Sequence, residues 1–441
     1  MQIEDVLKVL LKPYYYIIPT VICGGQKRKS EKSRLRKGSH IVITTPGRLL
    51  DHVLHTASFK VDNLCNIILD EADRLLDMGF EAQISQLMRI LNGRVRDAGH
   101  AHPQTVLLSA TLSPAITKLV QSTLRDYVFI DADKLLKQNP ALNKKPELPA
   151  ADQAETESDK KEDEDIFQMP EQLKQYYFNV QLGLQLPTLL AFLRKELRKT
   201  SKCKVLVFVN TCDSVEFLIE LLHEYEWPGD GMDTQVCKGS VLGLHGNMPQ
   251  YKRLENLRQF IKSDISTLIC TDVAARGLDI PTVDWVVQYD APTEVTEYVH
   301  RCGRTARAGE TGQSIIFLDP SEEGFITLLT KHNLVINQMN YDMWFKDAVR
   351  EPEGKGKFVF KTPFRACQDI QANINLLVEG EGSSVSGLQD LAAIGFSSYV
   401  RSYATYSKDL KTIFNVRQLH LGHVAKRYFL TYRPDSFLVL A

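Results

Sequence analysis

Apolar residues in this chain fall into short, mostly unbroken runs, separated by stretches with helical spacing. Unbroken aliphatic runs are typical of strands buried on both faces of a parallel sheet, and their alternation with helices indicates an α/β fold. We predict strands over residues 15–23, 41–44, 64–69, 105–108, 175–180 (an edge strand), 204–211, 267–270 and 312–317. We predict helices over residues 3–11, 80–91 and 187–198.

A change in composition divides this pattern into domains. A chain of 441 residues is too long for one hydrophobic core and predicts two or three domains. Proline, alanine, glutamate and aspartate dominate residues 136–170, as is typical of a disordered acidic linker. We therefore expect domains over 1–135, 171–332 and 333–441. In the last of these, one helical stripe typical of core packing holds Ala392, Phe396, Tyr399, Val400 and Tyr403.

Charge and cysteine content narrow the class of protein. The 53 basic and 54 acidic residues nearly cancel, so any nucleic-acid site must be a local patch, for which the basic run at 26–37 is a candidate. The eight cysteines form no Cys-x-x-Cys pair, which favours reduced thiols in the core over a metal site or disulfides. No apolar run reaches membrane-spanning length, and we expect no membrane partner.

The apolar run 64–69 ends in the acids Asp70, Glu71 and Asp73. Acids at the carboxyl end of a parallel strand lie where open α/β sheets bind ligands. Because Asp70 and Glu71 are adjacent on an extended backbone, their side chains diverge, so that one can hold a metal while the other faces a water. This suits Mg²⁺-assisted phosphoryl transfer. The alternative is a solvated acidic turn.

Three motifs together carry a family resemblance. Asp-Glu-Ala-Asp at 70–73, Ser-Ala-Thr at 109–111 and the run His-Arg-Cys-Gly-Arg-Thr-Ala-Arg at 300–307 resemble, in order and separation, motifs of the DEAD-box RNA helicases. The segment 419–424 resembles the C-terminal extension of nucleolar members that assemble the large ribosomal subunit. The resemblance implies an α/β fold of two RecA-like parallel-sheet domains, the first incomplete, followed by a mostly helical C-terminal extension.

The resemblance also implies roles in ATP hydrolysis. Asp70 would hold Mg²⁺ through water and Glu71 would orient the attacking water, while Arg304 and Arg307 act as arginine fingers. The arginines at 301, 304 and 307 recur every third residue, and we expect them near a helix start on roughly one face, around an anion. The remaining implied residues contact the nucleotide or relay its state: Asp73, Ser109, Thr111, Gly277, Asp279 and His300.

The resemblance also implies a set of residues that contact RNA. Thr45 can cap a helix whose first position is Pro46, and a helix N-terminus beside Arg48 makes an anion site. Capping alone would explain Thr45 and Pro46, though not the whole Thr-Pro-Gly-Arg run. The residues implied to bind RNA are Gly24, Gly25, Thr45, Pro46, Gly47, Arg48, Asn210, Thr211, Gly246, Arg253 and Thr271.

The family's phosphate loop, Gly-x-x-x-x-Gly-Lys-Thr, does not occur in these 441 residues and would precede residue 1. We expect its strand to lie between those carrying Asp-Glu-Ala-Asp and Ser-Ala-Thr, and its loss to expose apolar faces. We also expect no RNA-stimulated ATP hydrolysis from this chain alone.

The alternatives are a non-catalytic RNA-binding or assembly scaffold and a related DNA helicase. The cofactors implied are ATP and Mg²⁺. The partners implied are pre-ribosomal RNA and pre-ribosomal proteins, for a monomer in the nucleus and nucleolus.

Overall fold

The structure is a computed structural model of the chain. It describes residues 2–23, 28–77, 79–109, 114–130, 169–170, 172–227, 234–272, 280–306, 311–349, 363–379 and 387–430. Two compact units, Met1–Ile166 and Phe167–Ala441, each have hydrophobic clusters of their own. Most of the predicted acidic linker lies outside the described residues.

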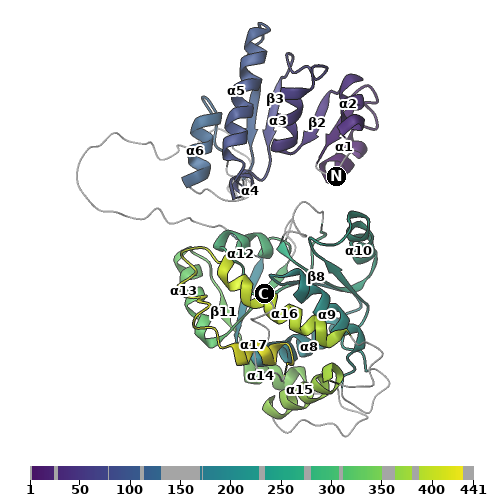
Figure 1. Cartoon of the computed structure of the whole chain (residues 1–441), viewed down its shortest axis with the longest axis vertical. Coiled ribbons are helices and arrows are strands. Elements are labelled where there is room, and N and C mark those ends of the chain that lie inside the picture. Colours follow the sequence, from purple (N-terminus) through teal and green to yellow (C-terminus); the bar gives the residue numbers. More distant parts are fainter. Residues whose placement is uncertain are drawn as a thin grey trace, which may run out of the picture. The chain divides into compact units, whose positions relative to one another are not determined.

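The first unit contains two separate two-stranded parallel sheets, β1–β2 and β3–β4 (Figure 1). The strands are β1 (Pro19–Ile22), β2 (Ile41–Thr44), β3 (Asn66–Leu69) and β4 (Gln104–Leu107). The helices are α1 (Gln2–Leu10), α2 (Arg28–Arg36), α3 (Pro46–His55), α4 (Ala72–Asp77), α5 (Glu81–Asp97) and α6 (Pro114–Thr123). Leu87 and Leu91 of α5 pack with Val53 of α3, Leu35 of α2 and Ile22 of β1.

Two expectations for this unit are corrected. β3 and β4 pair directly, from Asn66 opposite Gln104 to Leu69 opposite Leu107, so no strand separates them. β3 was expected to be buried on both faces, yet its residues alternate between exposed and half-buried, and Ile68 is 65 % exposed. The expectation of exposed apolar faces on these strands is confirmed.

The second unit is built on a seven-stranded parallel sheet with the order β11-β5-β10-β9-β6-β8-β7. The strands are β5 (Leu173–Asn179), β6 (Cys203–Phe208), β7 (Ser240–Leu244), β8 (Ile265–Cys270), β9 (Trp285–Gln288), β10 (Gly312–Leu318) and β11 (Asn337–Gln338). β5 lies between β10 and the two-residue β11, so the prediction of an edge strand over 175–180 is wrong.

Helices cover both faces of this sheet. They are α8 (Leu182–Lys199), α9 (Cys212–Glu224), α10 (Gln250–Lys262), α12 (Val295–Cys302), α13 (Gly324–Lys331), α14 (Tyr341–Ala348), α15 (Pro363–Glu379), α16 (Leu388–Ser402) and α17 (Leu421–Arg427), with 3₁₀ turns η1 (Pro320–Glu322) and η2 (Tyr403–Thr405). Leu257 and Phe260 of α10 pack in one cluster with Leu206 and Leu268 of the sheet. The larger cluster joins the sheet to α8, α9 and the C-terminal helices.

The C-terminal helices belong to the core of the second unit. α16 packs on α9 and α17 packs on α8 (Figure 1). All five residues of the predicted stripe, from Ala392 to Tyr403, are buried in the larger cluster, so the core-packing prediction is confirmed.

Helix α8 begins at Leu182, five residues before the predicted start, and therefore contains Pro187. Proline has no N–H to donate to the carbonyl one turn earlier, which belongs to Gly183. Gln371 of α15 supplies the missing donor, with Nε2 2.5 Å from the Gly183 oxygen. The C-terminal region thus completes the hydrogen bonding of a helix that lies on the sheet.

All eight cysteines are free thiols, and five of them are buried. The five buried thiols agree with the expectation of cysteines in the core. No helix in the described part of the chain is long and apolar enough to cross a membrane.

The buried carboxyl group of Glu322 joins η1 to the C-terminal region, and we expect it to make the stability of the second unit depend on pH. Burial raises the pKa of Glu322 to about 7, although the Tyr403 hydroxyl and the Asp319 backbone N–H donate to it and oppose the rise. Because the pKa of Glu322 is higher in the folded state, its protonated carboxyl group contributes to the free energy of unfolding. This contribution is fully present below the ordinary pKa of 4.5 and is lost as the pH rises through 7. The free energy of unfolding of the unsubstituted chain should fall between about pH 5 and 8. In Glu322→Gln this fall should be smaller by as much as ~3 kcal/mol.

The measurement is urea unfolding of the second unit at a series of pH values, with Glu323→Gln as control. Glu323 is the exposed neighbour of Glu322. A Glu322→Gln profile that superimposes on that of the unsubstituted chain would contradict the prediction.

Candidate functional site

The acidic motif lies where β3 ends. Asp70 is exposed, and its Oδ1 accepts a hydrogen bond from the Glu71 N–H at 3.0 Å. The Ala72 N–H donates to the Leu108 oxygen at 2.9 Å, so the main chain ties this motif to the segment that leads into half-buried Ser109. Thr111 lies outside the described residues. The structure therefore brings the Asp-Glu-Ala-Asp segment next to the residues that lead into Ser109.

Glu71 has an unusual backbone and a fixed side chain. Its φ of +50° lies in the left-handed region, which costs a non-glycine residue of order 1–3 kcal/mol. Arg74 Nη1 donates to Glu71 Oε2 at 2.5 Å. Asp70 and Glu71 are both exposed, whereas Asp73 is only 4 % exposed. Two carboxylates thus face solvent at the strand end, and Arg74, which the sequence analysis missed, orients one of them.

A single strand-end carboxylate suits Mg²⁺, which keeps several waters and uses one or two carboxylates together with substrate phosphates. One oxygen of Asp70 is taken by the Glu71 N–H, and a second carboxylate oxygen remains for such a cation. Within the described ranges, no group of three or more His, Cys, Asp or Glu side chains could hold a metal by itself. The residues present therefore fit Mg²⁺ held jointly with a nucleotide.

The Thr-Pro-Gly-Arg turn begins α3 as predicted, with Thr45 at the N-cap and Pro46 at the first position. The Thr45 side chain makes no capping bond, so that part of the prediction is wrong. Arg48 Nε lies 3.3 Å from Oε2 of Glu31, a fully buried acid on the basic helix α2. His52 Nε2 contacts the same oxygen at 3.1 Å. Glu31 and His52 thus position Arg48; neither was singled out from sequence.

In the second unit, Arg301 joins three neighbouring strand ends. Asn210 follows β6, Asp272 follows β8 and Asp290 follows β9, and these strands are adjacent and parallel. Arg301, 1 % exposed, donates through Nε to Asp272 Oδ1 at 2.7 Å, through Nη2 to Asn210 Oδ1 at 2.9 Å and through Nη1 to the Asp290 carbonyl at 2.6 Å. One guanidinium therefore fixes three loops at the ligand-binding edge of the sheet.

This position of Arg301 corrects the expectation of three arginines near a helix start. α12 ends at Cys302, so Arg301 lies in its last turn and half-buried Arg304 lies beyond it. The Asp272 carboxylate balances the charge of Arg301 internally, so Arg301 needs no bound anion to offset its charge. His300 is half-buried on α12, and Arg307 lies outside the described residues.

The remaining predicted residues of this unit fall into two groups. Arg253 donates to the Met248 carbonyl at 2.9 Å and the Gly246 carbonyl at 2.8 Å, and so holds the loop after β7. The Thr271 hydroxyl, at the end of β8, is buried and has no hydrogen-bond partner in the structure. Besides Thr111 and Arg307, four predicted residues lie outside the described ones: Gly24 and Gly25 of the first unit, and Gly277 and Asp279 of the second.

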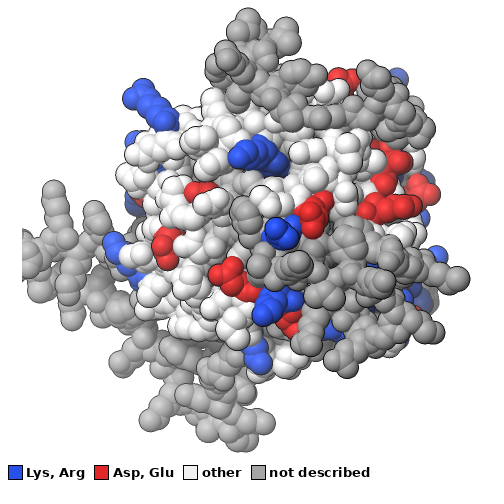
Figure 2. Space-filling view, turned by 90° about the horizontal axis from the view of Figure 1, so that it is seen from below, with Lys and Arg blue, Asp and Glu red and all other residues white. Residues whose placement is uncertain are grey.

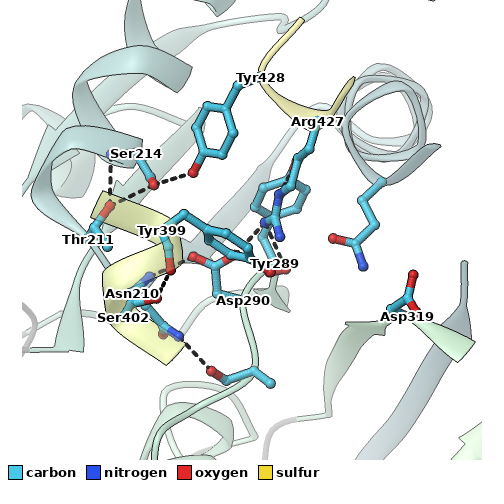
Figure 3. Close-up of polar contacts among 12 residues, drawn as sticks. Asn210, Thr211, Ser214, Tyr289, Asp290, Asp319, Tyr399, Ser402, Arg427 and Tyr428 are labelled. Atoms are coloured by element: carbon cyan, nitrogen blue, oxygen red, sulfur yellow. Dashed lines mark hydrogen bonds and ion pairs between the residues drawn. The ribbon is translucent and has the colours of Figure 1, made fainter. Parts of the chain in front are cut away.

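Asp290 was missed although the sequence offered a signal for it. Two residues separate it from the short apolar run 285–287, whereas Asp70 directly follows the run 64–69. Its carboxylate accepts from the Asn210 N–H at 2.8 Å and pairs with Arg427 of α17, and both charged groups are almost fully buried (Figure 3). No sequence pattern marks Arg427.

The surface charge agrees with the near-zero net charge of the chain. Figure 2 shows one face on which the basic and acidic side chains of the described residues are interspersed. That face carries no field of a single sign, so the structure places no broad basic surface there.

Three families match successive parts of the chain. DEAD/DEAH box helicases match residues 1–119, the helicase conserved C-terminal domain matches 188–309, and the C-terminal extension of SPB4-like ATP-dependent rRNA helicases matches 386–436. Mss116 bound to single-stranded RNA and UDP-BeF has the same fold, with a TM-score of 0.70 at 24 % identity over 98 % of this chain and 74 % of that one. The predicted fold class, two RecA-like parallel-sheet units with a helical C-terminal region, is confirmed.

Named relatives cover almost the whole chain. It is 38 % identical to the ATP-dependent DNA helicase DDX31 of Homo sapiens, over 100 % of this chain and 52 % of that protein. It is 36 % identical to the DEAD-box ATP-dependent RNA helicase 17 of Oryza sativa subsp. japonica, over 99 % and 76 %. It is 34 % identical to the ATP-dependent RNA helicase dbp7 of Aspergillus terreus, over 99 % and 59 %. The chain spans about half the length of the human relative, and it belongs to the DEAD-box family of ATP-dependent RNA helicases.

Proposed function

We propose that the protein is an RNA-dependent ATPase that remodels RNA duplexes or RNA–protein complexes during assembly of the large ribosomal subunit. The names of the dbp7 relatives and of the SPB4-like rRNA helicase extension support the RNA substrate. The partners we propose are pre-ribosomal RNA and pre-ribosomal proteins, met by a monomer in the nucleus and nucleolus.

The observation that carries this proposal is the set of hydrogen bonds from Arg301 to Asn210, Asp272 and Asp290, which we call the Arg301 junction. It holds the loops after β6, β8 and β9 side by side at the carboxyl edge of the sheet, where Asn210, Thr211 and Thr271 were predicted to meet RNA. Contacts from such loops fall on phosphates and riboses, which position RNA without reading its sequence. The side-chain amide atoms and the N–H of Asn210 are all engaged within the unit, so we assign the RNA contact of this residue to its backbone carbonyl, which can accept from a ribose hydroxyl.

For ATP hydrolysis we propose that Asp70 holds Mg²⁺ through water and that Glu71 orients the attacking water. Mg²⁺, when bound, would offset the negative charge of the phosphates. Arg304 and Arg307 would stabilise the charge that develops in the transition state. The residues proposed to sense the nucleotide or relay its state are Asp73, Ser109, Thr111, Gly277, Asp279 and His300.

The second candidate function, a non-catalytic RNA-binding scaffold, is favoured by one sequence observation. No Gly-x-x-x-x-Gly-Lys-Thr loop occurs among the 441 residues. We therefore expect this chain by itself to bind RNA equally well with and without ATP and to show no RNA-stimulated hydrolysis. Turnover that is lost in Glu71→Gln but kept in Glu81→Gln, an exposed glutamate of the same unit, would overturn that expectation.

The test of the proposed function is binding of a labelled single-stranded RNA to the whole chain, with a DNA of the same sequence as control. We expect RNA to bind about tenfold or more tightly than DNA, because a 2′-hydroxyl is the group that distinguishes them. Fluorescence anisotropy at a fixed salt concentration measures both affinities. Equal affinities would favour a DNA helicase, the activity that the human relative's name states.

A further inference from the structure

The connection 209–211 between β6 and α9 and the first turn of α9, together called the loop 209–214, are tied to the C-terminal region by several side chains. It carries Asn210 and Thr211, both predicted to contact RNA, and Thr211 is the N-cap of α9. The opposing side chains come from α16, α17 and the segments that follow them, about two hundred residues later in the sequence. Figure 3 shows these groups directed toward one another.

The first tie is a chain of three hydroxyl groups. Tyr428 Oη lies 2.7 Å from Ser214 Oγ, which lies 2.7 Å from Thr211 Oγ1. The Ser214 N–H donates to the same Thr211 oxygen at 3.1 Å, which is the capping bond of α9. Tyr428 is 3 % exposed. Its hydroxyl therefore fixes Ser214, and through it the rotamer of the Thr211 side chain.

The second tie holds Asn210. The Tyr406 hydroxyl donates to the Ala291 carbonyl at 3.0 Å, and the Asn210 Nδ2 donates to the same carbonyl at 2.9 Å. Asn210 Nδ2 also lies 3.4 Å from the Tyr406 oxygen. A separate hydrogen bond joins α16 to the first turn of α9, where the Ser398 hydroxyl donates to Asp213 Oδ2.

The third tie is a buried ion pair. Arg427 lies over the Tyr289 and Tyr399 rings, 4.0 and 4.4 Å from their centroids, and pairs with Asp290 Oδ1. The other oxygen of Asp290 accepts from the Asn210 N–H at 2.8 Å. A buried ion pair adds little net stability over apolar residues of the same size, whereas it strongly favours one arrangement of its groups. The orientation of the Asp290 carboxylate, and of the backbone it holds, thus depends on Arg427.

We propose that the C-terminal region is a positioning element for RNA binding, in which Tyr406, Arg427 and Tyr428 hold the loop 209–214 in the conformation that receives an RNA phosphate. None of the three touches RNA in this proposal; each acts through Asn210 or Thr211. The inference rests on the proposed function, because it assumes that the loop after β6 meets RNA.

The test compares tyrosine-to-phenylalanine variants of the whole chain, which keep the rings and remove one hydroxyl each. Tyr406→Phe and Tyr428→Phe are each expected to weaken binding of a labelled single-stranded RNA about threefold to tenfold, the weight of one hydrogen bond. Tyr225→Phe is the matched control: it is similarly buried at 4 %, and its hydroxyl has no hydrogen-bond partner in the structure. The control should bind RNA as the unsubstituted chain does.

A double-mutant cycle separates positioning from general support of the fold. If Tyr428 acts through Thr211, then Tyr428→Phe should weaken RNA binding no further in a Thr211→Val background. Fully additive losses, equal weakening by Tyr225→Phe, or unchanged affinity in both test variants would overturn the inference while leaving RNA binding intact. Failure of the unsubstituted chain to bind RNA would instead contradict the proposed function, and this inference with it.

Discussion

Arg301→Met is expected to lower the free energy of unfolding of the second unit by about 3–5 kcal/mol, the cost of leaving a buried charge without its partner. Methionine would fill much of the space but would leave Asp272 without its partner and the Asn210 and Asp290 oxygens without a donor. Arg301→Lys should recover only part of the loss, because an ammonium cannot reproduce a fork of donors aimed at three loops.

Urea unfolding followed by tryptophan fluorescence measures this effect selectively. All three tryptophans of the chain, Trp227, Trp285 and Trp344, lie in the second unit, so the signal reports that unit alone. The matched control is Arg304→Met, three residues away and half-buried, which should change the free energy of unfolding by about 1 kcal/mol or less. An Arg301→Met variant no less stable than the Arg304→Met variant would show that the junction does not support the fold.

Arg427→Met is expected to destabilise the same unit by a similar amount, about 3–5 kcal/mol, because the buried Asp290 would lose the cation that balances it. Asp290→Asn in the Arg427→Met background removes the uncompensated charge and keeps an oxygen for the Asn210 N–H. The double variant should therefore be more stable than Arg427→Met alone.

The same tryptophan-monitored unfolding gives the coupling energy of this pair, which we expect to reach ~1–3 kcal/mol. Arg417→Met, an exposed arginine of the same region, is the control and should leave stability nearly unchanged. Strictly additive losses from the two single substitutions would mean that Arg427 and Asp290 do not depend on each other.

Local sequence features predicted the parts of the fold that local physics determines. The unbroken run 64–69 became β3, and the acids after it lie at the end of that strand as expected. Thr45 and Pro46 begin α3. The stripe from Ala392 to Tyr403 is buried. In each case the determining residues are near neighbours in sequence.

What the sequence did not reveal depends on partners far apart in the chain. The direct pairing of β3 with β4 is a matter of strand order, which periodicity does not encode. The three-residue spacing of Arg301 and Arg304 suggested a shared face. It contains no information on Asp272, 29 residues earlier, to which the buried Arg301 donates hydrogen bonds. Arg427 lies 137 residues from Asp290, and no spacing rule connects them.

The hydrogen bond from Gln371 to the Gly183 carbonyl bears on how this protein can be divided. Pro187 removes the intrahelical donor of that buried carbonyl, and the replacement comes from 188 residues downstream. A fragment that stops at residue 309, where the match to the helicase conserved C-terminal domain ends, would leave this acceptor without its donor and expose the apolar flanks of α8 and α9 to water. The chain beyond that point supplies part of the hydrophobic core of the second unit, so a fragment that ends there cannot keep that core whole.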